Sequence, residues 1–379
     1  MHRTQKRFVA GGVSRFALFW LVGCGGESHT VTPSTAQSSV SQADVAAEAG
    51  AKAPTPSRTS SPAATDNRPA GASRAPATAQ SQPAAPLDSD APALFWLEIG
   101  AGTVTRAAAD GSGARVIASG APLSAPDGVT VDPVGKHFFV LNMGNAIGGA
   151  NSGSLVRYDL DGSNPEVIMK PGTKVGDITF NTGKQVTIDA QSHKLYLGDR
   201  EGSKVWRCDY DGQNLEVLVS GHDINQVVGV GADPKARQFY FSDRNGKKLF
   251  RANMDMPKGQ THENRDDVEL LYVDKSPSAM PLDIELDVNE RMVYWTDRYQ
   301  NKVFGMSMDM PNGETPTTRS DVKTIASNLT QAIGLALDHE SGVLYVTHAG
   351  SVSTVKTDGS DLKVIGSNGS TGITFAKLQ

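Results

Sequence analysis

Residues 294–297 read Tyr-Trp-Thr-Asp, and the segment after the next turn, at 303–308, reads Val-Phe-Gly-Met-Ser-Met. A similar pair of short segments, both rich in apolar residues, recurs along the last three quarters of the chain. The first segments end at six positions spaced 44 to 57 residues apart, at Glu98, Asn142, Asp199, Asp243, Asp297 and His348. Six units of similar length predict a repeat architecture.

Each unit contains two further strand signals. The third segments include 114–118 and 322–326, and the fourth segments include 128–132 and 282–287. The dipeptide Asp-Gly, a turn signal between strands, follows the second segment in four of the six units. No stretch of the repeats keeps a 3.6-residue apolar period long enough for a helix. Six groups of four short strands predict an all-β fold, a six-bladed β-propeller of four-stranded blades.

The two ends of the repeat region predict how the ring closes. The folded region begins with the second strand of a blade, near Leu94, and ends at 372–376 with a first strand. We therefore expect the C-terminal strand to join the first blade. Such closure removes the free edge that an open stack of sheets would leave.

Tyr294–Asp297 and the following segment 303–309 resemble the YWTD repeat, also called the low-density-lipoprotein receptor class B repeat. The resemblance covers all six units, although only this copy is literal. It implies a six-bladed propeller that binds other proteins or acts as a rigid spacer. We assign a structural role to the repeated motif residues, which are Asp199, Asp243, Tyr294, Trp295, Thr296 and Asp297.

An acidic residue at the end of the first segment and an arginine in the second recur together. We expect Asp199 to face Arg207, and Asp243 to face Arg251, across their hairpins. An exposed ion pair of this kind contributes about 0–1 kcal/mol, and a partly buried pair helps blades to pack. Repetition around the ring argues against catalysis, because a reaction needs one asymmetric group of residues.

The N-terminal region has a different composition from the repeats. Residues 25–92 contain 17 Ala, 18 Ser or Thr, 9 Pro and a single Leu, with no aromatic residue. A segment of this composition cannot bury a core, so we expect a disordered linker. The predicted division is a signal peptide at 1–23, a lipid-anchored linker at 24–93 and the propeller at 94–379.

The first residues predict export and a membrane anchor. Basic residues precede the short apolar run 16–22, as in a secretory signal peptide. The following Leu21–Cys24 segment resembles the bacterial lipobox, which implies that Cys24 is lipidated and begins the mature chain. More than one acyl chain on Cys24 would suffice for stable anchoring. We expect a bacterial cell-envelope location, and the outer membrane in a Gram-negative cell because Gly25 replaces the Asp that retains lipoproteins at the inner membrane.

Charge and cysteine content exclude several functions for the folded region. Residues 94–379 contain 28 Lys and Arg and 35 Asp and Glu, for a formal charge of −7. A general nucleic-acid binder would be basic, so we expect no nucleic-acid partner. Two cysteines cannot form a disulfide framework. Cys208 aligns with apolar residues of the other repeats, which predicts a thiol in the core.

Three consecutive hairpins carry basic residues on the face where the links between blades also emerge. Seven such residues on one arc could form a positive patch that attracts an anionic partner. The alternative is that they protect strand edges. The predicted partner-binding residues are Arg200, Lys204, Arg244, Lys247, Lys248, Arg298 and Lys302.

Two adjacent units contain long insertions of matched design. Both begin with Met-Asp-Met-Pro, at 254–257 and 308–311, and run to about Asp267 and Asp321. The insertions could form one binding platform. They could equally be copies inherited from one duplicated blade, without a function of their own.

The function that we infer is non-enzymatic: a monomeric, lipid-anchored envelope or cell-surface propeller that binds an unidentified protein through one face, without a cofactor. The alternative is a calcium-dependent hydrolase or lactonase of the six-bladed type. Such enzymes hold calcium in the central channel with carboxylate and Asn ligands. The candidate ligands for that alternative are Asp127, Asn225 and Asp283.

Overall fold

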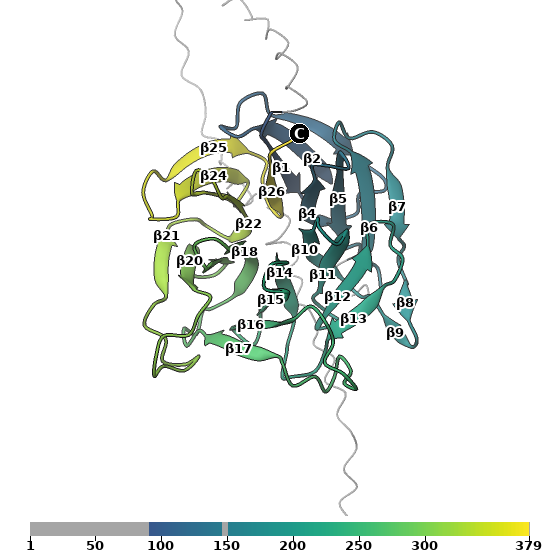
Figure 1. Ribbon diagram of the computed structural model, residues 1–379. Helices are drawn as coiled ribbons and strands as arrows, with labels where there is room; N and C mark the ends of the chain where they lie inside the picture. The colour runs from purple at the N-terminus through teal and green to yellow at the C-terminus, as the bar shows by residue number, and fades with distance from the viewer. Residues whose placement is uncertain (1–90, 146–150, 379) are drawn as a thin grey trace, which may run out of the picture. The chain divides into compact units, whose positions relative to one another are not determined.

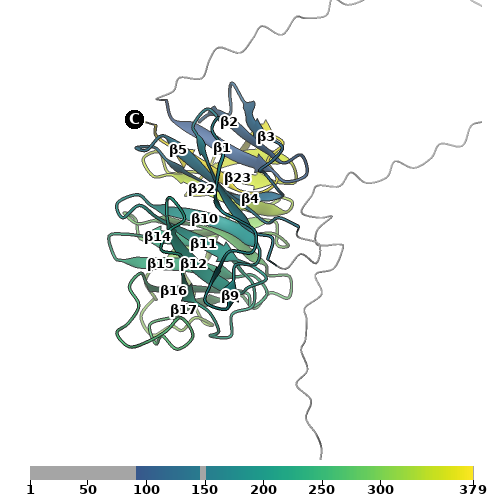
Figure 2. The same cartoon turned by 90° about the vertical axis from the view of Figure 1, so that its right-hand side faces the viewer.

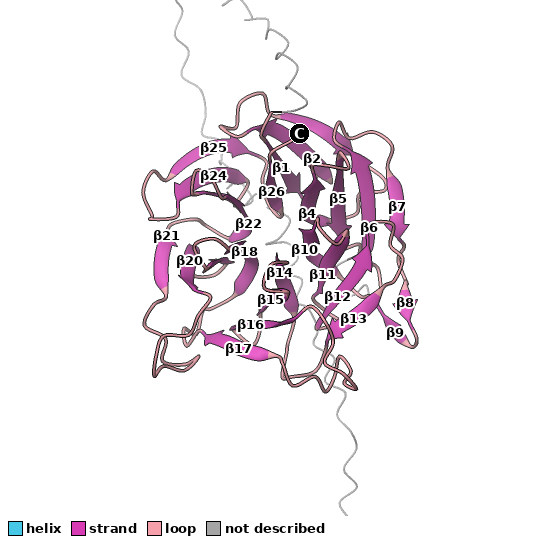
Figure 3. Cartoon of the chain, viewed as in Figure 1, coloured by secondary structure: helices cyan, strands magenta, loops and turns pink. Residues whose placement is uncertain are grey.

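The computed structural model describes residues 91–145 and 151–378, so the predictions for the signal peptide, the linker up to residue 90 and Cys24 lie outside it. Within the described residues, every helix or strand element is a strand (Figure 3). This part of the chain contains no helix that is long and apolar enough to cross a bilayer. Six four-stranded sheets form blades around a central axis (Figure 1).

Each of the first three blades runs outward from an innermost strand. Blade 1 contains β26 (Ile373–Ala376), β1 (Ala93–Glu98), β2 (Thr103–Ala108) and β3 (Arg115–Ser119). Blade 2 contains β4 (Pro126–Asp132), β5 (His137–Asn142), β6 (Ser154–Asp159) and β7 (Glu166–Met169). Blade 3 contains β10 (Gly183–Asp189), β11 (Lys194–Asp199), β12 (Lys204–Asp209) and β13 (Glu216–Val219).

The other three blades repeat the same order. Blade 4 contains β14 (Val227–Asp233), β15 (Gln238–Asp243), β16 (Lys248–Asn253) and β17 (Glu269–Val273). Blade 5 contains β18 (Pro281–Asp287), β19 (Met292–Asp297), β20 (Lys302–Ser307) and β21 (Lys323–Ala326). Blade 6 contains β22 (Ala332–Asp338), β23 (Val343–His348), β24 (Ser351–Lys356) and β25 (Lys363–Ser367).

The all-β six-bladed architecture predicted from the repeats is confirmed, including the closure of the ring. β26 pairs antiparallel with β1, and Ala93 lies opposite Ala376. The Leu97 amide also donates to the Gly372 carbonyl at 3.0 Å. One small sheet was not predicted, because β8 (Lys174–Val175) and β9 (Ile178–Thr179) are too short to show an alternating pattern.

The inner strands approach each other closely around the axis, where β4, β10, β14, β18, β22 and β26 surround the centre in Figure 1. A Cβ atom added to Gly229 on β14 would lie 2.2 Å from the Leu282 carbonyl oxygen on β18. Only glycine permits this approach, and glycine occupies the same position on β4, β22 and, just before its first residue, β26. Gln185 and Asp283 hold this position in the two remaining blades.

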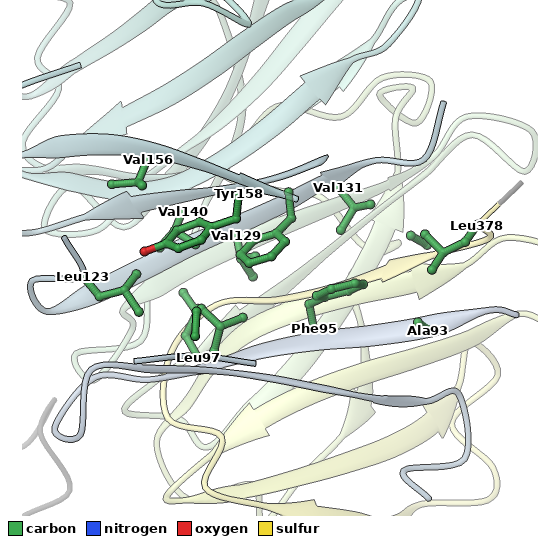
Figure 4. Close-up of a cluster of buried hydrophobic side chains, with 14 residues drawn as sticks. Ala93, Phe95, Leu97, Leu123, Val129, Val131, Val140, Val156, Tyr158 and Leu378 are labelled. Atoms are coloured by element: carbon green, nitrogen blue, oxygen red, sulfur yellow. The ribbon is translucent and has the colours of Figure 1, made fainter. Parts of the chain in front are cut away.

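Apolar side chains between neighbouring blades form the cores. Between blades 1 and 2, Phe95 lies 5.5 Å from Phe138, whose ring stacks on Tyr158 at 4.9 Å between ring centroids (Figure 4). Another seam joins blades 3 and 4, which lie side by side in Figure 2 as β10–β12 and β14–β16. Because each blade packs between two others, its second strand is buried on both faces, as in Val293–Asp297.

The outer edge of every blade is covered by the next blade. At four seams, a glycine of the Asp-Gly hairpin covers the edge of the preceding blade. Gly162, for example, has φ +88°, and a Cβ there would lie 2.0 Å from the Ile117 carbonyl oxygen of β3. The three equivalent positions are Gly111, Gly212 and Gly359. At each of these edges, a glycine with positive φ lies against the backbone of the preceding blade, where a side chain would not fit.

The long insertions cover the other two edges. Buried Arg265 in the first insertion donates to the Leu218 carbonyl of β13 at 2.9 Å, and the Ser220 amide donates to the His262 carbonyl. Arg319 in the second insertion donates to the Leu271 carbonyl of β17 at 3.3 Å. The matched insertions are therefore built into the edges of the preceding blades.

Candidate functional site at the channel and the connection face

The hairpins between second and third strands lie on the same face as the links between blades, and we name this side the connection face. Its backbone bonds join hairpin to link: the Arg244 amide donates to the Gln226 carbonyl at 2.9 Å, and the Arg298 amide donates to the Met280 carbonyl at 3.1 Å. Backbone hydrogen bonds thus hold the hairpins and the links of this face together around the end of the channel.

The aspartate of the motif holds this face together. Asp297 accepts hydrogen bonds from the amides of Met280 and Gln300, at 2.7 and 2.9 Å. Burial raises the pKa of Asp297, and it raises the pKa of Asp243 to about 6. The equivalent Asp199 accepts from the Thr182 amide at 2.9 Å.

The predicted pairing of Asp199 with Arg207 is wrong, because the β11–β12 register sets Lys204 opposite Asp199 and Tyr196 opposite Arg207. Arg207 instead donates to Glu216 at 2.7 Å. The same register separates Asp243 from Arg251, which donates to Glu269 at 2.8 Å.

The rest of the motif joins one blade to the next. The Thr296 hydroxyl donates to the Ile333 carbonyl of blade 6 at 2.5 Å and accepts from the Asp283 amide at 3.1 Å. Trp295 is buried and stacks on Phe304 at 5.4 Å. Tyr294 is 4% exposed and packs in the core between blades 5 and 6.

The three arginines of the predicted patch are buried: Arg200, Arg244 and Arg298 are 1%, 5% and 0% exposed. The prediction of an exposed patch is therefore wrong for these residues. Each arginine directly follows the motif and turns toward a link between blades, so it lies beneath the face. Arg244, for example, donates to the Gln226 side chain at 2.6 Å. The four lysines are half-buried: Lys204, Lys247, Lys248 and Lys302.

A buried polar group lies at the start of two inner strands. Lys184 on β10 and Asp127 on β4 are 3% and 0% exposed, and their Nζ and Oδ2 atoms are 2.6 Å apart. The Gln185 amide donates to Asp127 Oδ1 at 3.3 Å. Neither Lys184 nor Gln185 is among the site residues predicted from the sequence. An alignment of the inner strands would have singled out Lys184, because three other blades have an apolar residue at its position: Val228, Leu282 and Ile333.

Two acidic residues of β18 lie next to the channel. Asp283 is 6% exposed, and its Oδ2 accepts from the Leu335 amide at 2.9 Å. Burial raises the pKa of Asp283 to about 8, and the charge of Asp127 adds to the effect. Burial and Asp283 also raise the pKa of Glu285 well above its ordinary value.

The channel opens at the face opposite the connection face into a cavity of about 420 Å³. All six inner strands line it, and Thr130, Thr187 and Thr374 supply hydroxyl groups beside Glu285. A narrower space of about 30 Å³, lined by Gln185 and Asp283 among others, continues inward. The cavity has the dimensions of a small-ligand site.

The three calcium candidates have different surroundings. Asp127 is paired with Lys184, Asp283 accepts a backbone amide, and Asn225 is an exposed link residue whose amide donates to Asp243 Oδ1 at 3.0 Å. Among the described residues, no three His, Cys, Asp or Glu side chains form a group that could hold a metal ion. Calcium binding stays a prediction.

The remaining cysteine is a core residue, as predicted. Cys208 is 0% exposed in the core of blades 2 and 3, and burial raises its pKa to about 12. A thiol with this pKa carries no thiolate for nucleophilic attack near neutral pH.

Two curated fungal proteins are similar in sequence, whereas no family model matches the chain. The chain is 35% identical over 263 residues to low-density lipoprotein receptor-related protein 1 of Pyricularia oryzae, a match that covers 65% of this chain and 82% of that protein. It is 30% identical over 261 residues to the 3-hydroxyacyl-CoA dehydrogenase-like protein LAM1 of Cochliobolus heterostrophus, covering 62% of this chain and 52% of that protein.

Solved structures share the fold. A chain in the crystal structure of a nidogen/laminin complex has a TM-score of 0.58 and 18% identity, over 75% of this chain and 98% of that chain. A gluconolactonase of Xanthomonas campestris has a TM-score of 0.51 and 13% identity, over 72% and 86%. At these identities the likeness concerns the fold alone.

Proposed function

Because the chain belongs to the same family as low-density lipoprotein receptor-related protein 1 of Pyricularia oryzae, we propose that it is a non-enzymatic propeller that binds another protein through one face. The propeller is of the low-density-lipoprotein-receptor type, with six blades. The observation that carries the proposal is the connection face, where hairpins and links are hydrogen-bonded to one another around the ring. Such a surface is pre-organised, which lowers the entropy cost of binding.

The connection face has the side chains of a binding surface. Tyr299, on the hairpin between β19 and β20, is 46% exposed and lies against the Arg298 guanidinium at 5.8 Å. Tyrosine is enriched in protein interfaces because it is rigid and amphipathic. The half-buried Lys248 and Lys302 lie on the same face, so a partner with acidic groups fits it best.

A lipid anchor would set where this binding takes place. We propose that Cys24 is diacylated and that residues 25–90 connect the propeller to a bacterial envelope membrane, the outer one in a Gram-negative cell. The propeller would act as a monomer, without nucleic acid. Metabolic labelling with palmitate tests the anchor: the chain incorporates label, and Cys24→Ala removes it. Equal labelling of both forms would contradict the anchor.

Photo-crosslinking tests the binding face. A photoreactive residue is placed at Tyr299 and, as a matched control, at Val134, which is 73% exposed on the hairpin between β4 and β5 at the opposite face. After illumination in cells, position 299 yields one discrete protein adduct that mass spectrometry identifies, and position 134 yields none. Absence of an adduct at 299, or the same adducts at both positions, contradicts the proposal.

The channel supports a second candidate, the calcium-dependent hydrolase or lactonase. Asp127, Asp283 and Glu285 are three acidic groups near one axis, contributed by only two blades. A reaction requires an asymmetric group of this kind, whereas the motif residues repeat around the ring. Lys184 already neutralises Asp127, which favours the binding protein over the enzyme.

A further inference from the structure

An arginine ladder fills the outer part of blades 3 and 4. In blade 3 the Arg207 guanidinium lies 5.8 Å from the centre of the Tyr196 ring and donates to Glu216 at 2.9 and 2.7 Å. It also donates to the Met254 carbonyl of the next blade at 2.8 Å. In blade 4, Arg251 likewise donates to Glu269, to the Tyr240 hydroxyl and to the Met308 carbonyl of the next blade. The fold therefore builds a guanidinium site between a tyrosine, an acidic residue and a carbonyl.

Blade 6 keeps the site and lacks the arginine. Tyr345 lies opposite Thr354, and Thr354 lies opposite Lys363, at the positions of Tyr196, Arg207 and Glu216. A cavity of about 340 Å³ occupies the place of the missing side chain. Ala109, three residues after the arginine position of blade 1, lines the cavity at the position of Met254.

One buried polar atom at this cavity has no hydrogen-bond partner among the described residues. Thr354 is 5% exposed and its buried Oγ1 accepts and donates no bond. Tyr345 is 4% exposed, and burial together with Asp338 and Asp110 raises its pKa to about 12. In blades 3 and 4 the matching tyrosine hydroxyls contact the arginine at 3.4 and 3.5 Å. An unpaired buried hydroxyl is costly, so a ligand that bonds to Thr354 gains affinity.

The walls match a guanidinium on an aliphatic stem. Val355 and Ile365 supply apolar surface, and Asp110 and Asp338 supply carboxylates. The two lysines of the rim, Lys356 and Lys363, do not fill the space: Lys356 pairs with Asp361 at 2.6 Å, and the side chain of Lys363 is exposed.

Blade 5 also lacks the arginine, but its tyrosine ring lies against that position. Gly305 takes the arginine position there, and a Cβ on it would lie 2.9 Å from the Tyr294 ring. The Tyr294 ring therefore lies close to the arginine position of blade 5.

We propose that this cavity binds an alkylguanidinium group, supplied by an arginine side chain of a protein partner. The guanidinium lies over the Tyr345 ring, donates to Thr354, the Ala109 carbonyl and Asp110, and completes the ladder that blades 3 and 4 build for themselves. The assignment rests on the proposed protein-binding function, but its test does not require the partner.

Titration calorimetry with N-acetylarginine amide tests the cavity, with N-acetyllysine amide as the matched probe of equal charge. We expect one site for the arginine probe and about tenfold weaker binding of the lysine probe, because only guanidinium bonds in a planar, bidentate way. Equal binding of the two probes, or no binding of either, overturns the proposal. Tighter binding of agmatine than of the peptide-like probe overturns the assignment to a protein partner.

Three variants locate the binding. Thr354→Arg fills the cavity from within and abolishes binding, whereas Lys363→Glu restores the acceptor of the other blades and tightens binding about tenfold. Asp110→Asn, at an exposed position where folding is not at risk, weakens binding several-fold. Unchanged affinity in Lys363→Glu and Asp110→Asn contradicts the site even if Thr354→Arg does not fold. If cavity binding fails while Tyr299 still crosslinks, the proposed function survives and this inference does not.

Discussion

Gly162 lies directly against the backbone of Ile117 in the preceding blade, so close that an added Cβ would stand 2.0 Å from its carbonyl oxygen. The contact explains why Asp-Gly recurs after the second strands of four blades: the turn needs glycine for its positive φ and for the neighbouring edge. The hairpin signal in the sequence is thus also a signal for how blades assemble.

Gly162→Ala tests this contact. The substitution adds both backbone strain at φ +88° and a clash with Ile117, so we expect a loss of about 2 kcal/mol or more in urea unfolding. Gly172→Ala is the matched control, because its φ is +80° and nothing lies within 4 Å of the added Cβ. Equal losses in the two variants would show that the contact with Ile117 has no energetic weight.

The buried pair of Lys184 and Asp127 predicts strong coupling. Lys184→Met leaves the Asp127 carboxylate buried without its cation, at a cost of about 3–5 kcal/mol. The double variant Lys184→Met with Asp127→Leu removes both charges and recovers most of the loss. Denaturant unfolding of the four forms measures the coupling. Additive losses in the double variant would show that the two charges do not depend on each other.

Asp283 predicts a pH dependence of stability. Its pKa is about 8 when folded and near 3.8 when unfolded, so the unfolded chain releases the proton first as the pH rises. The stability contributed by this group is complete below pH 3.8, falls as the pH rises to about 8 and is constant above. The melting temperature of Asp283→Asn should therefore exceed that of the natural protein by an increasing margin from pH 4 to 8, as measured by thermal unfolding. A margin that stays constant or shrinks would contradict the raised pKa.

The calcium alternative has its own test. Calorimetric titration of calcium into the protein should give no heat of specific binding, because Lys184 already pairs with Asp127. Tight one-to-one binding that Asp283→Asn abolishes would favour the hydrolase over the binding protein. Magnesium serves as the control for non-specific ion effects.

Much of the fold could be predicted from the sequence, because short apolar strands and turn signals repeat six times. The side-chain partners could not. Whether Asp199 meets Arg207 or Lys204 depends on a hairpin register, and the burial of Arg244 depends on the path of a link. Neither contact follows from a repeating pattern in the sequence. The cavity at Thr354 could be predicted in part, since blades 1, 2, 3 and 4 keep arginine where blade 6 has threonine.

The cavity at Thr354 and the channel are both lined in part by blade 1, which β26 completes. The most direct measurement is disulfide trapping of Ala93→Cys with Ala376→Cys, which lie opposite each other in the β1–β26 pair. A closed ring predicts an intramolecular disulfide, found by mass spectrometry in the monomer, and a melting temperature above that of the reduced form. Free thiols under oxidising conditions, or disulfide-linked dimers alone, would contradict the closed ring.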